Sequence, residues 1–493
     1  MLERELKFYI PLDQRDGVAQ AMQELRAVTV PLHACYFDTK QGDLAKDRIA
    51  LRLRQEGQQW VQTIKAPGPD KITHIELNHL RPDATLDLSV YHNSAIAGAI
   101  FGLETELLMR YETVISRQVV TLNHQGSQIE LAYDLGVIRS GDQQTQVSEL
   151  EFEQLAGAVD DLFDLAMQWL HRHALVLDFR SKAERGNTLA TRRSLHKSRK
   201  THDIAATADI NLTQAYLQSA NECLAHIVAN ANLLAGSEGP VTANMAITYV
   251  HQLRVGIRRL RSCWRLFSPW IETIEKRPAP VLLDYFAVLG QDRDRDITHT
   301  VIAPKLVRAG MPAHTASHQG QDEDAGPSRA MAADPKLQSA LLEVLHGLVS
   351  TAERPQEPDQ PGISKLVKRL NKWLEHINTQ GSEFTHLAEN AQHDLRKKVK
   401  RLRYNLDFCA GLLEASSLTS ISQALSKAQN TLGDLNDLYV AYQHYVPLTA
   451  EQPSAWFALG WLRAMQQQKS RQAHADFIVL AQAGRLKKRK HHN

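Results

Sequence analysis

The sequence predicts an α+β protein of two domains. The first is an antiparallel eight-strand β-barrel with flanking helices, and the second is an all-α domain built from a duplicated helical bundle. Three observations lead to this prediction. Residues up to about 178 alternate with the period of two that is typical of strands. The polar faces of these strands carry acids and bases, which a closed sheet can enclose. From about Leu212 the apolar period becomes helical, and one basic motif occurs twice.

The strand pattern recurs along the first part of the chain. In addition to the N-terminal segment, it covers residues 33–37, 49–54, 60–65, 72–77, 117–122, 129–133 and 147–153. Helical patterns interrupt the strands at residues 16–25 and 159–173. This order predicts a mostly antiparallel β-domain with helices on its outer surface.

The N-terminal segment places three charged residues on one face of its predicted strand. Glu3, Glu5 and Lys7 alternate with other residues, so their side chains point the same way. Carboxylates suit Mg²⁺ or Mn²⁺, and a lysine suits the phosphate that such metals usually carry. Taken alone, this strand also fits an exposed sheet edge with solvated charges. The strands that follow favour a binding site.

Cations and acids recur on the polar faces of the later strands. Arg52 and Arg54 share one face of their strand, and Lys65 closes the next strand. Further along, a row of three acids shares one face of its strand, namely Glu149, Glu151 and Glu153. Three like charges in a row repel one another unless cations or a metal lie opposite. A closed barrel with a charged interior provides this, and one of eight strands is about wide enough for a small ligand.

The order of these motifs resembles that of CYTH domains, the triphosphate tunnel metalloenzymes. The resemblance covers roughly residues 1–185 and rests on Glu3-x-Glu5-x-Lys7, Tyr36-Phe37-Asp38-Thr39, Leu51-Arg52-Leu53-Arg54, Lys65, Glu149-x-Glu151-x-Glu153 and Ser181-Lys182. It implies a barrel-shaped tunnel that binds a linear triphosphate or a triphosphate ester with a divalent metal. One position departs from the family, because His74 stands where we expect an arginine. This change weakens one phosphate contact and makes binding there sensitive to pH.

The resemblance also implies roles for individual residues. It implies phosphate binding by the cations Lys7, Arg52, Arg54, Lys65, Arg117 and Lys182. It implies metal binding or orientation of water by the carboxylates Glu3, Glu5, Glu76, Asp134, Glu149, Glu151 and Glu153. The residues expected to act in catalysis are Glu5, Lys7, Lys65 and Glu151, with Mg²⁺ or Mn²⁺ as cofactor.

These roles predict metal-dependent hydrolysis of inorganic triphosphate to diphosphate and phosphate. Phosphoryl transfer depends mainly on positioning and charge neutralisation, so cations and metals hold the polyanion while a carboxylate orients water. The sequence shows no nucleophile motif and no glycine-rich phosphate loop. An adenylate cyclase or a thiamine triphosphatase would use the same tunnel, with a pocket for its base or thiazolium. A non-catalytic protein on polyphosphate granules is a third interpretation, which metal-dependent phosphate release would exclude.

The second half of the chain contains a duplicated basic helix. The motif His251-x-x-Arg254-x-x-x-Arg258-x-x-Arg261 recurs with the same spacing as His393-x-x-Arg396-x-x-x-Lys400-x-x-Arg403. On a helix these residues form one stripe opposite an apolar stripe. Each copy is followed by an acidic segment, at residues 289–294 and 432–437, which we interpret as a loop. The duplication predicts two bundle halves that bring both basic helices into one groove.

The two basic stripes predict binding of a polyanion. A lone arginine-rich helix is usually a solvated face, but here a histidine recurs in register and few acids lie at i,i+4 to neutralise the stripe. This half resembles the CHAD domain over about residues 212–482, which implies binding of inorganic polyphosphate. Nucleic acid is disfavoured because aromatic residues suited to base stacking are not interleaved with the stripe.

The domain boundaries follow from these patterns. We expect a CYTH domain at residues 1–190, a basic linker at 191–208 and a CHAD domain at 209–482. A segment at about 309–335 is rich in Gly, Pro, Ser, His and Asp, and we expect it to be a flexible insert. Residues 483–493 form a basic tail that we expect to be frayed.

Composition limits the class and location of the protein. The net charge is only +2, so local fields matter more than the total. Four widely spaced cysteines indicate neither a zinc site nor a disulfide framework. No signal peptide or membrane span stands out, so we expect a cytoplasmic protein, associated with polyphosphate granules if the second domain binds that polymer. No feature of the sequence predicts an oligomeric state.

Overall fold

The computed structural model describes residues 2–201, 210–272, 277–312, 326–354 and 360–489. Contacts divide the chain into two compact units. Unit 1 comprises Met1–Lys200, Ala225–Leu253 and Asp324–Ala352, and unit 2 comprises Thr201–Leu224, Arg254–Glu323 and Glu353–Asn493. Unit 1 therefore combines the predicted β-domain with segments from the helical half of the chain.

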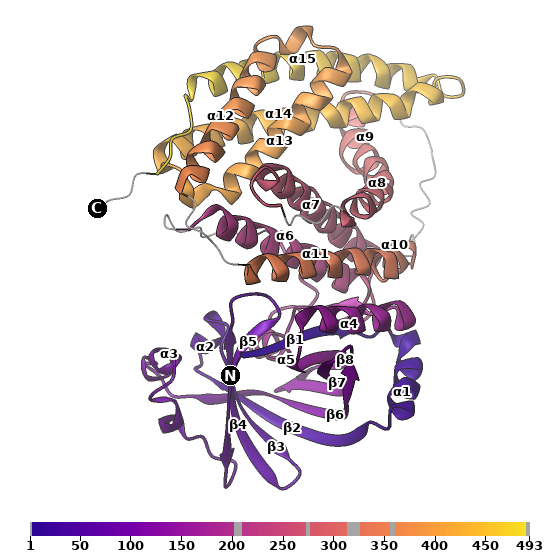
Figure 1. Cartoon of the computed structure of the whole chain (residues 1–493). Helices are drawn as coiled ribbons and strands as arrows, with labels where there is room; N and C mark the ends of the chain where they lie inside the picture. The colour runs from indigo at the N-terminus through magenta and orange to yellow at the C-terminus, as the bar shows by residue number, and fades with distance from the viewer. Residues whose placement is uncertain (1, 202–209, 273–276, 313–325, 355–359, 490–493) are drawn as a thin grey trace. The chain divides into compact units, whose positions relative to one another are not determined.

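The strands of unit 1 are β1 Leu2–Tyr9, β2 Val28–Asp38, β3 Ala50–Glu56, β4 Gln59–Pro67, β5 Thr73–Arg81, β6 Leu108–His124, β7 Ser127–Ser140, β8 Gln143–Ala156 and β9 Val176–Leu177. They form one antiparallel sheet in the order β5-β4-β3-β2-β6-β7-β8-β1, and β1 pairs back to β5 (Figure 1). This pairing closes a barrel of eight strands, and the short β9 adds beside β1. The predicted fold class is confirmed.

Apolar side chains cover the outside of the barrel. Phe8 of β1 and Phe152 of β8 are buried, and the Phe152 ring contacts that of Trp169. On β3 and β4, Leu51 and Ile64 belong to a second apolar cluster. The covering helices are η1 Leu12–Gln14, α1 Arg15–Glu24, α2 Asp43–Lys46, η2 Leu88–Tyr91, α3 Ala97–Phe101, α4 Val159–His173 and α5 Lys182–Ala190.

The charged residues of the strands face the barrel interior. Because alternate residues of a strand point to opposite faces, outward apolar side chains turn their neighbours inward. The registers then place charges side by side, since Lys7 lies opposite Glu151 and Arg117 lies opposite Asp134. Burying so many charges is tolerable only because acids and bases meet across neighbouring strands.

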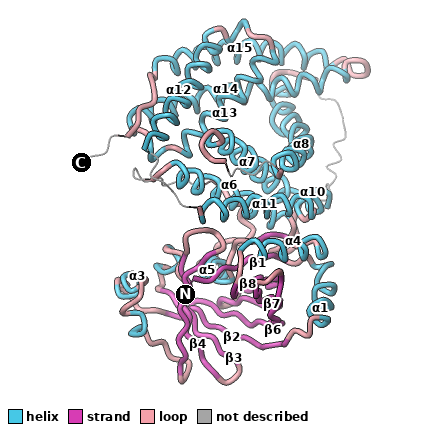
Figure 2. The backbone as a smooth tube through the Cα atoms, viewed as in Figure 1, coloured by secondary structure: helices cyan, strands magenta, loops and turns pink. Residues whose placement is uncertain are grey.

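The rest of the chain is helical (Figure 2). The elements are α6 Leu212–Leu234, α7 Ala243–Phe267, α8 Pro278–Ile297, η3 Thr298–Ile302, α9 Ala303–Arg308, α10 Gly326–Ala332, α11 Pro335–Glu353, α12 Gln360–Ser382, η4 Phe384–His386, α13 Glu389–Phe408, η5 Ala410–Leu412, α14 Ala415–Leu448 and α15 Ser454–Gln482. The long helices α14 and α15 enclose an apolar core in unit 2, with Leu438, Ala441 and Leu462 among its buried residues.

Two interpretations of the sequence are wrong. The acidic segments are helical rather than loops, since residues 289–294 lie in α8 and residues 432–437 lie in α14. In α14 the leucines at 432, 435 and 438 recur at helical spacing and are buried. The basic tail is docked rather than frayed up to residue 489, because Leu486 is buried and its backbone N–H donates to Asn371 Oδ1 at 2.9 Å.

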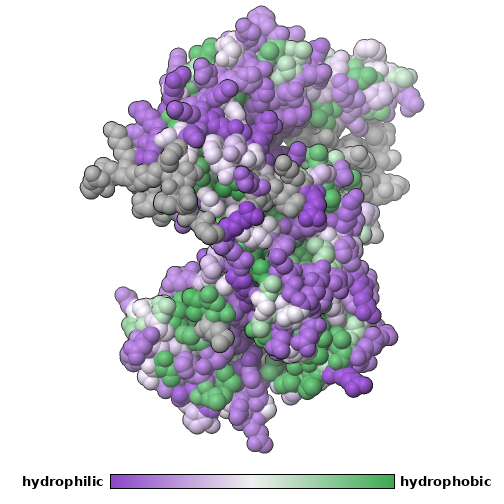
Figure 3. Space-filling view, in the orientation of Figure 1, coloured by the Kyte–Doolittle hydropathy of each residue, from purple (hydrophilic) through white to green (hydrophobic). Residues whose placement is uncertain are grey.

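Other predictions lie partly outside the described residues. These are residues 202–209 of the predicted linker, 313–325 of the predicted insert and 490–493 of the tail. In the described part of the chain, no helix has the length and apolar character needed to cross a membrane. Hydrophilic residues cover much of the face around α12, α14 and α15 that the space-filling view shows (Figure 3).

Candidate functional site

Lys65 on β4 lies at the centre of an acidic cluster in the barrel. Its Nζ is 3.0 Å from Glu3 Oε2 and 3.1 Å from Glu5 Oε2, both on β1. On β5, Glu76 Oε2 is 3.8 Å away from the same nitrogen. Strand alternation brings Glu3 and Glu5 to one face, and the β4–β5 register places Glu76 opposite Lys65. The structure thus brings these four predicted residues together.

This acidic cluster holds protons because it contains more carboxyls than cations. Burial, a hydrogen bond with Glu76 and repulsion by Glu5 raise the pKa of Glu3 to about 9. Burial opposes the charge of Glu76 as well, but the hydrogen bond from Glu3 and the charges of Arg52 and Lys65 lower its pKa to about 2. Burial and the charges of neighbouring acids raise the pKa of Glu153 to about 7. Glu3 and Glu76 therefore share one proton at neutral pH.

The donor set fits a hard divalent cation. Magnesium and manganese prefer carboxylate oxygens, and the oxygens of three acids already converge on the ammonium of Lys65. Glu3 Oε2 is buried and makes no hydrogen bond in the described chain besides this ion pair. A divalent cation would be held here by Glu3, Glu5 and Glu76, with Glu153 beside them, in place of the shared proton.

A second cluster forms around Lys182, the first residue of α5. Its Nζ lies 2.8 Å from Asp134, 2.9 Å from Glu149 and 2.7 Å from Glu151. Arg117 makes two bonds of 2.7 Å to Asp134 and one of 2.6 Å to Glu151. Although burial opposes ionisation, the charges of Lys182 and Arg117 hold the pKa values of Asp134 and Glu151 low. These acids are ionised, and their oxygens are engaged by cations.

Arg52 and Arg54 present unused donors inside the barrel. The Nε atoms of both are buried and make no hydrogen bond in the described residues. Burial and the positive charges of Arg52 and Arg117 lower the pKa of Arg54 to about 10. Three guanidinium groups that repel one another, with two of them keeping free buried donors, form a site that an anion with several oxygens would satisfy.

His74 faces the same interior, with Nε2 3.8 Å from Glu5 Oε1. Burial and the charge of Lys65 lower its pKa, so the imidazole is neutral at pH 7. It therefore does not supply the positive charge that an arginine would bring to this position.

The basic helices α7 and α13 are neighbours within unit 2, as predicted. Arg259 of α7 is buried over the rings of Tyr404 and Phe408 of α13. Burial and the charges of Arg265 and Arg261 lower the pKa of Arg401, so cations from both helices lie close together.

The residues of the predicted stripes have different surroundings. Arg254 and Arg258 stack on the ring of Phe286. Arg403 donates to Gln429 Oε1 at 2.7 Å, and His393 lies 3.0 Å from Asn436 Oδ1. Arg396 and Lys400 lie on α13 and Arg261 on α7, while His251 belongs to the part of α7 in unit 1.

Family models match both halves of the chain. Residues 1–186 match the model described as the CYTH domain, and residues 218–446 match that of the CHAD domain. The chain joins a CYTH domain to a CHAD domain. The barrel with its two charged clusters thus lies in the CYTH match, and both basic helices lie in the CHAD match.

Relatives resemble each part of this CYTH–CHAD chain. An inorganic triphosphatase of Haemophilus influenzae is 32% identical over 167 residues, which are 32% of this chain and 46% of the relative. The chain thus spans about half the length of that relative. An uncharacterized protein of Mycobacterium tuberculosis is 25% identical over 462 residues, 87% of this chain and 85% of its own. The crystal structure of the CHAD domain from Ricinus communis is 24% identical, with a TM-score of 0.47, and covers 60% of this chain and 100% of its own.

Sequence reasoning missed several residues of both domains. The charges of Glu151 and Arg117 influence the pKa of Glu130 in the CYTH domain, so these side chains lie close together. Glu130 shares a face of its strand with Asp134, and this period-two spacing could have identified it from the sequence. In the CHAD domain, Arg369 donates a hydrogen bond to the backbone oxygen of Arg265, and the charge of Arg265 lowers the pKa of Arg401. Both contacts arise only from the packing of helices. No local pattern in the sequence predicts them.

Proposed function

We propose that the CYTH domain hydrolyses inorganic triphosphate to diphosphate and phosphate with Mg²⁺ or Mn²⁺. The observation that carries this proposal is the juxtaposition, in one barrel, of guanidinium groups with unused donors and carboxyls with too few cations. The first group suits a polyphosphate anion and the second a divalent metal. The Haemophilus influenzae relative is an inorganic triphosphatase, which supports this substrate.

The residues divide into three roles in this proposal. The phosphate oxygens are held by the cations of the interior, namely Lys7, Arg52, Arg54, Lys65, Arg117 and Lys182. A metal held by Glu3, Glu5, Glu76 and Glu153 would supply further positive charge to the phosphoryl oxygens. Because Asp134, Glu149 and Glu151 are engaged by cations, we assign them the positioning of Lys182, Arg117 and Lys7.

The chemical step needs only a water molecule and a carboxylate to orient it. The water oxygen attacks the terminal phosphorus, the bond to the bridging oxygen breaks, and diphosphate leaves. Glu5 and Glu151 are both ionised, since their pKa values are lowered despite burial by the charges of Lys65 and Lys182 respectively. Of the two, Glu5 can accept a hydrogen bond from the water and then its proton, because both oxygens of Glu151 are already engaged by Lys182 and Arg117.

For the CHAD domain we propose binding of inorganic polyphosphate, which implies association with polyphosphate granules in the cytoplasm. Support comes from the like charges that Arg261, Arg265 and Arg401 gather on neighbouring helices. Like charges held together in a fold are stabilised when a polyanion covers them. Binding of long-chain polyphosphate to the full chain, compared with a short phosphate, tests this proposal.

Phosphate release from three substrates tests the proposal for the CYTH domain. Inorganic triphosphate, ATP and thiamine triphosphate are compared with Mg²⁺, with Mn²⁺ and with chelator. We expect metal-dependent release that prefers inorganic triphosphate. A preference for ATP or thiamine triphosphate would assign the barrel to an organic triphosphate, and no release from any of the three would overturn hydrolysis.

A further inference from the structure

Glu238 lies in the loop between α6 and α7, within the range that matches the CHAD domain. This loop belongs to the same compact unit as the barrel, because Ala225–Leu253 are part of unit 1. The side chain of Glu238 is only 1% exposed. A carboxylate buried to this degree requires cations and hydrogen-bond donors around it.

Both oxygens of this carboxylate are held by residues of the CYTH domain. Oε1 accepts a hydrogen bond from Arg180 Nη1 at 2.8 Å and lies 2.9 Å from Arg185 Nε. Oε2 accepts hydrogen bonds from Thr145 Oγ1 at 3.0 Å and from Arg185 Nη2 at 3.2 Å. Glu238 therefore pairs with two guanidinium groups at once, and Arg180 is held by Asp178 as well.

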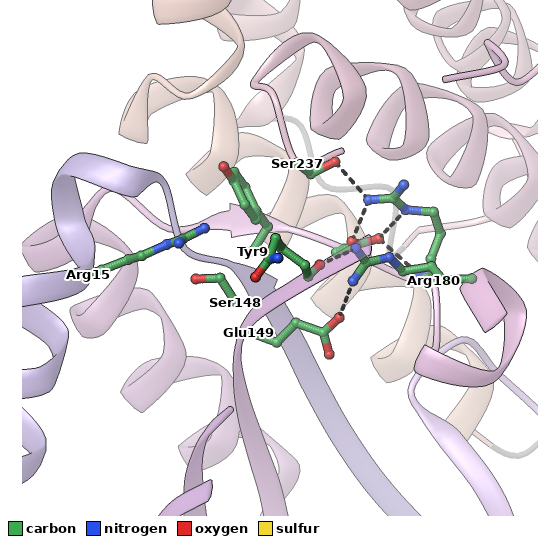
Figure 4. Close-up of a pocket in the computed structure, with 9 residues that line it drawn as sticks. Tyr9, Arg15, Ser148, Glu149, Arg180 and Ser237 are labelled. Atoms are coloured by element: carbon green, nitrogen blue, oxygen red, sulfur yellow. Dashed lines mark hydrogen bonds and ion pairs between the residues drawn. The ribbon is translucent and has the colours of Figure 1, made fainter. Parts of the chain in front are cut away.

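Residues next to Glu238 in the loop make further contacts with the CYTH domain. Ser237 Oγ accepts a hydrogen bond from Arg180 Nη2 at 2.9 Å (Figure 4). The hydroxyl of Tyr9, at the end of β1, donates to the backbone oxygen of Gly236 at 3.3 Å. Gly236 has a φ of +92°, which residues with a side chain rarely adopt. The turn that inserts Glu238 thus depends on a glycine.

The two arginines connect Glu238 to the barrel interior. Arg185 Nη1 donates to Glu149 Oε1 at 3.0 Å. The other oxygen of Glu149 lies 2.9 Å from Lys182 Nζ and 3.9 Å from Lys7 Nζ. The backbone oxygen of Arg180 accepts a hydrogen bond from Lys7 Nζ. A chain of charged contacts thus runs from the helical segment to two cations of the proposed phosphate site.

We propose that Glu238 is a positioning residue that sets the place of Lys7 and Lys182 for triphosphate. This inference rests on the function proposed for the barrel. Without the charge of Glu238, Arg185 keeps Glu149 as its acidic partner and draws it away from Lys182. A small cavity lined by Tyr9, Arg15, Ser148, Glu149, Arg180 and Ser237 lies beside these side chains (Figure 4).

The test compares Glu238→Gln and Glu238→Asp in the full chain with the matched control Asp160→Asn. Asp160 on α4 lies 2.7 Å from His346 on α11, an exposed contact that also joins the β-domain to a helical segment of unit 1. The measurements are kcat and KM for inorganic triphosphate with Mg²⁺, and the dissociation constant of triphosphate by calorimetry. We expect Glu238→Gln to raise KM about tenfold with kcat within about twofold. Glu238→Asp should recover much of this loss, and Asp160→Asn should change neither constant.

Several outcomes would overturn the inference. An unchanged KM in Glu238→Gln, with or without a lower melting temperature, would leave Glu238 a purely structural residue. If the wild-type protein releases no phosphate, the proposed hydrolysis fails. The role of Glu238 is then tested by binding alone, and equal dissociation constants for triphosphate in wild type and Glu238→Gln overturn it. Absence of any triphosphate binding to wild type overturns both. Should the Gln variant not fold, an unchanged KM in Thr145→Val, which removes a hydrogen bond to Glu238 Oε2, overturns it.

Discussion

Glu3 and Glu153 are carboxyls of the barrel that hold protons near neutral pH. Burial and neighbouring acids raise their pKa values to about 9 and about 7. A carboxyl with a higher pKa in the folded chain than in the unfolded chain stabilises the fold at low pH, and this contribution is lost as pH rises through the folded value. A metal that binds the ionised forms counteracts the loss.

We therefore expect Mg²⁺ to raise the melting temperature more at high pH than at low pH. The window follows from the two pKa values, about 7 for Glu153 and about 9 for Glu3. Thermal melts between about pH 6 and about pH 9, with Mg²⁺ or with chelator, measure the effect. A shift of the same size at every pH would contradict it. The double variant Glu3→Gln and Glu153→Gln should flatten the pH dependence.

A second prediction concerns Arg54. Its buried Nε has no acceptor, and the charges of Arg52 and Arg117 oppose its own. Hydrogen bonds to charged groups contribute about 1.5–3 kcal/mol, so Arg54→Gln should raise KM for triphosphate at least about tenfold. The substitution removes this repulsion but also the ion pair of Arg54 with Glu56, so the melting temperature should change little.

The matched control for Arg54 is Arg192→Gln, an arginine that is 81% exposed. It should change neither KM nor the melting temperature. If Arg54→Gln lowers the melting temperature and leaves KM unchanged, Arg54 supports the fold rather than the anion site.

At the scale of elements, the cap of α5 connects helix formation to the site. The Ser181 hydroxyl accepts a hydrogen bond from the Glu184 N–H at 3.0 Å, which fixes the first turn of the helix. Lys182 is the first residue of that turn. A cation is disfavoured at a helix N-terminus, and the three carboxylates around Lys182 offset this cost.

Loss of this cap should affect both stability and substrate affinity. Ser181→Ala should lower the free energy of unfolding by about 1 kcal/mol and raise KM, because Lys182 loses its fixed position. Thr188→Ala, on the same helix, removes a hydroxyl that bonds to the Glu184 carbonyl and serves as control. Chemical denaturation and steady-state kinetics measure the two effects. Equal KM values in both variants would show that the helix cap does not influence substrate binding.

The barrel elements were predictable from sequence because each strand carries its own pattern. Period-two alternation in β1, β3 and β8 marks both the strand and the inward face, and so identified Glu3, Arg52 and Glu149. The acidic part of α14 was misread because Asp and Asn usually indicate loops, whereas buried leucines decide its helix. The tail is docked by contacts with distant residues, namely hydrogen bonds between Leu486 and Asn371 and backbone hydrogen bonds of residues 487–489 with residues 412–414. Such long-range contacts leave no local pattern.

At the scale of the whole molecule, the family matches and the compact units divide the chain differently. The CHAD match covers residues 218–446, but Ala225–Leu253 belong to unit 1 with the barrel. Glu238 illustrates why sequence could not predict this. Its partners Arg180 and Arg185 are more than fifty positions away, and only the folded chain brings them together.

The last prediction concerns the polyanion site that we propose for unit 2. The double variant Arg261→Gln and Arg401→Gln should weaken binding of long-chain polyphosphate and reduce its dependence on salt, since fewer charges are screened. Hydrolysis of triphosphate should be unaffected, because neither residue belongs to the barrel. The control Lys305→Gln and Arg308→Gln removes the same charge from exposed positions on α9. The affinity for polyphosphate is measured at low and at high salt. An equal loss of affinity in both double variants would mean that binding depends on the net charge of the protein rather than on the neighbouring helices α7 and α13.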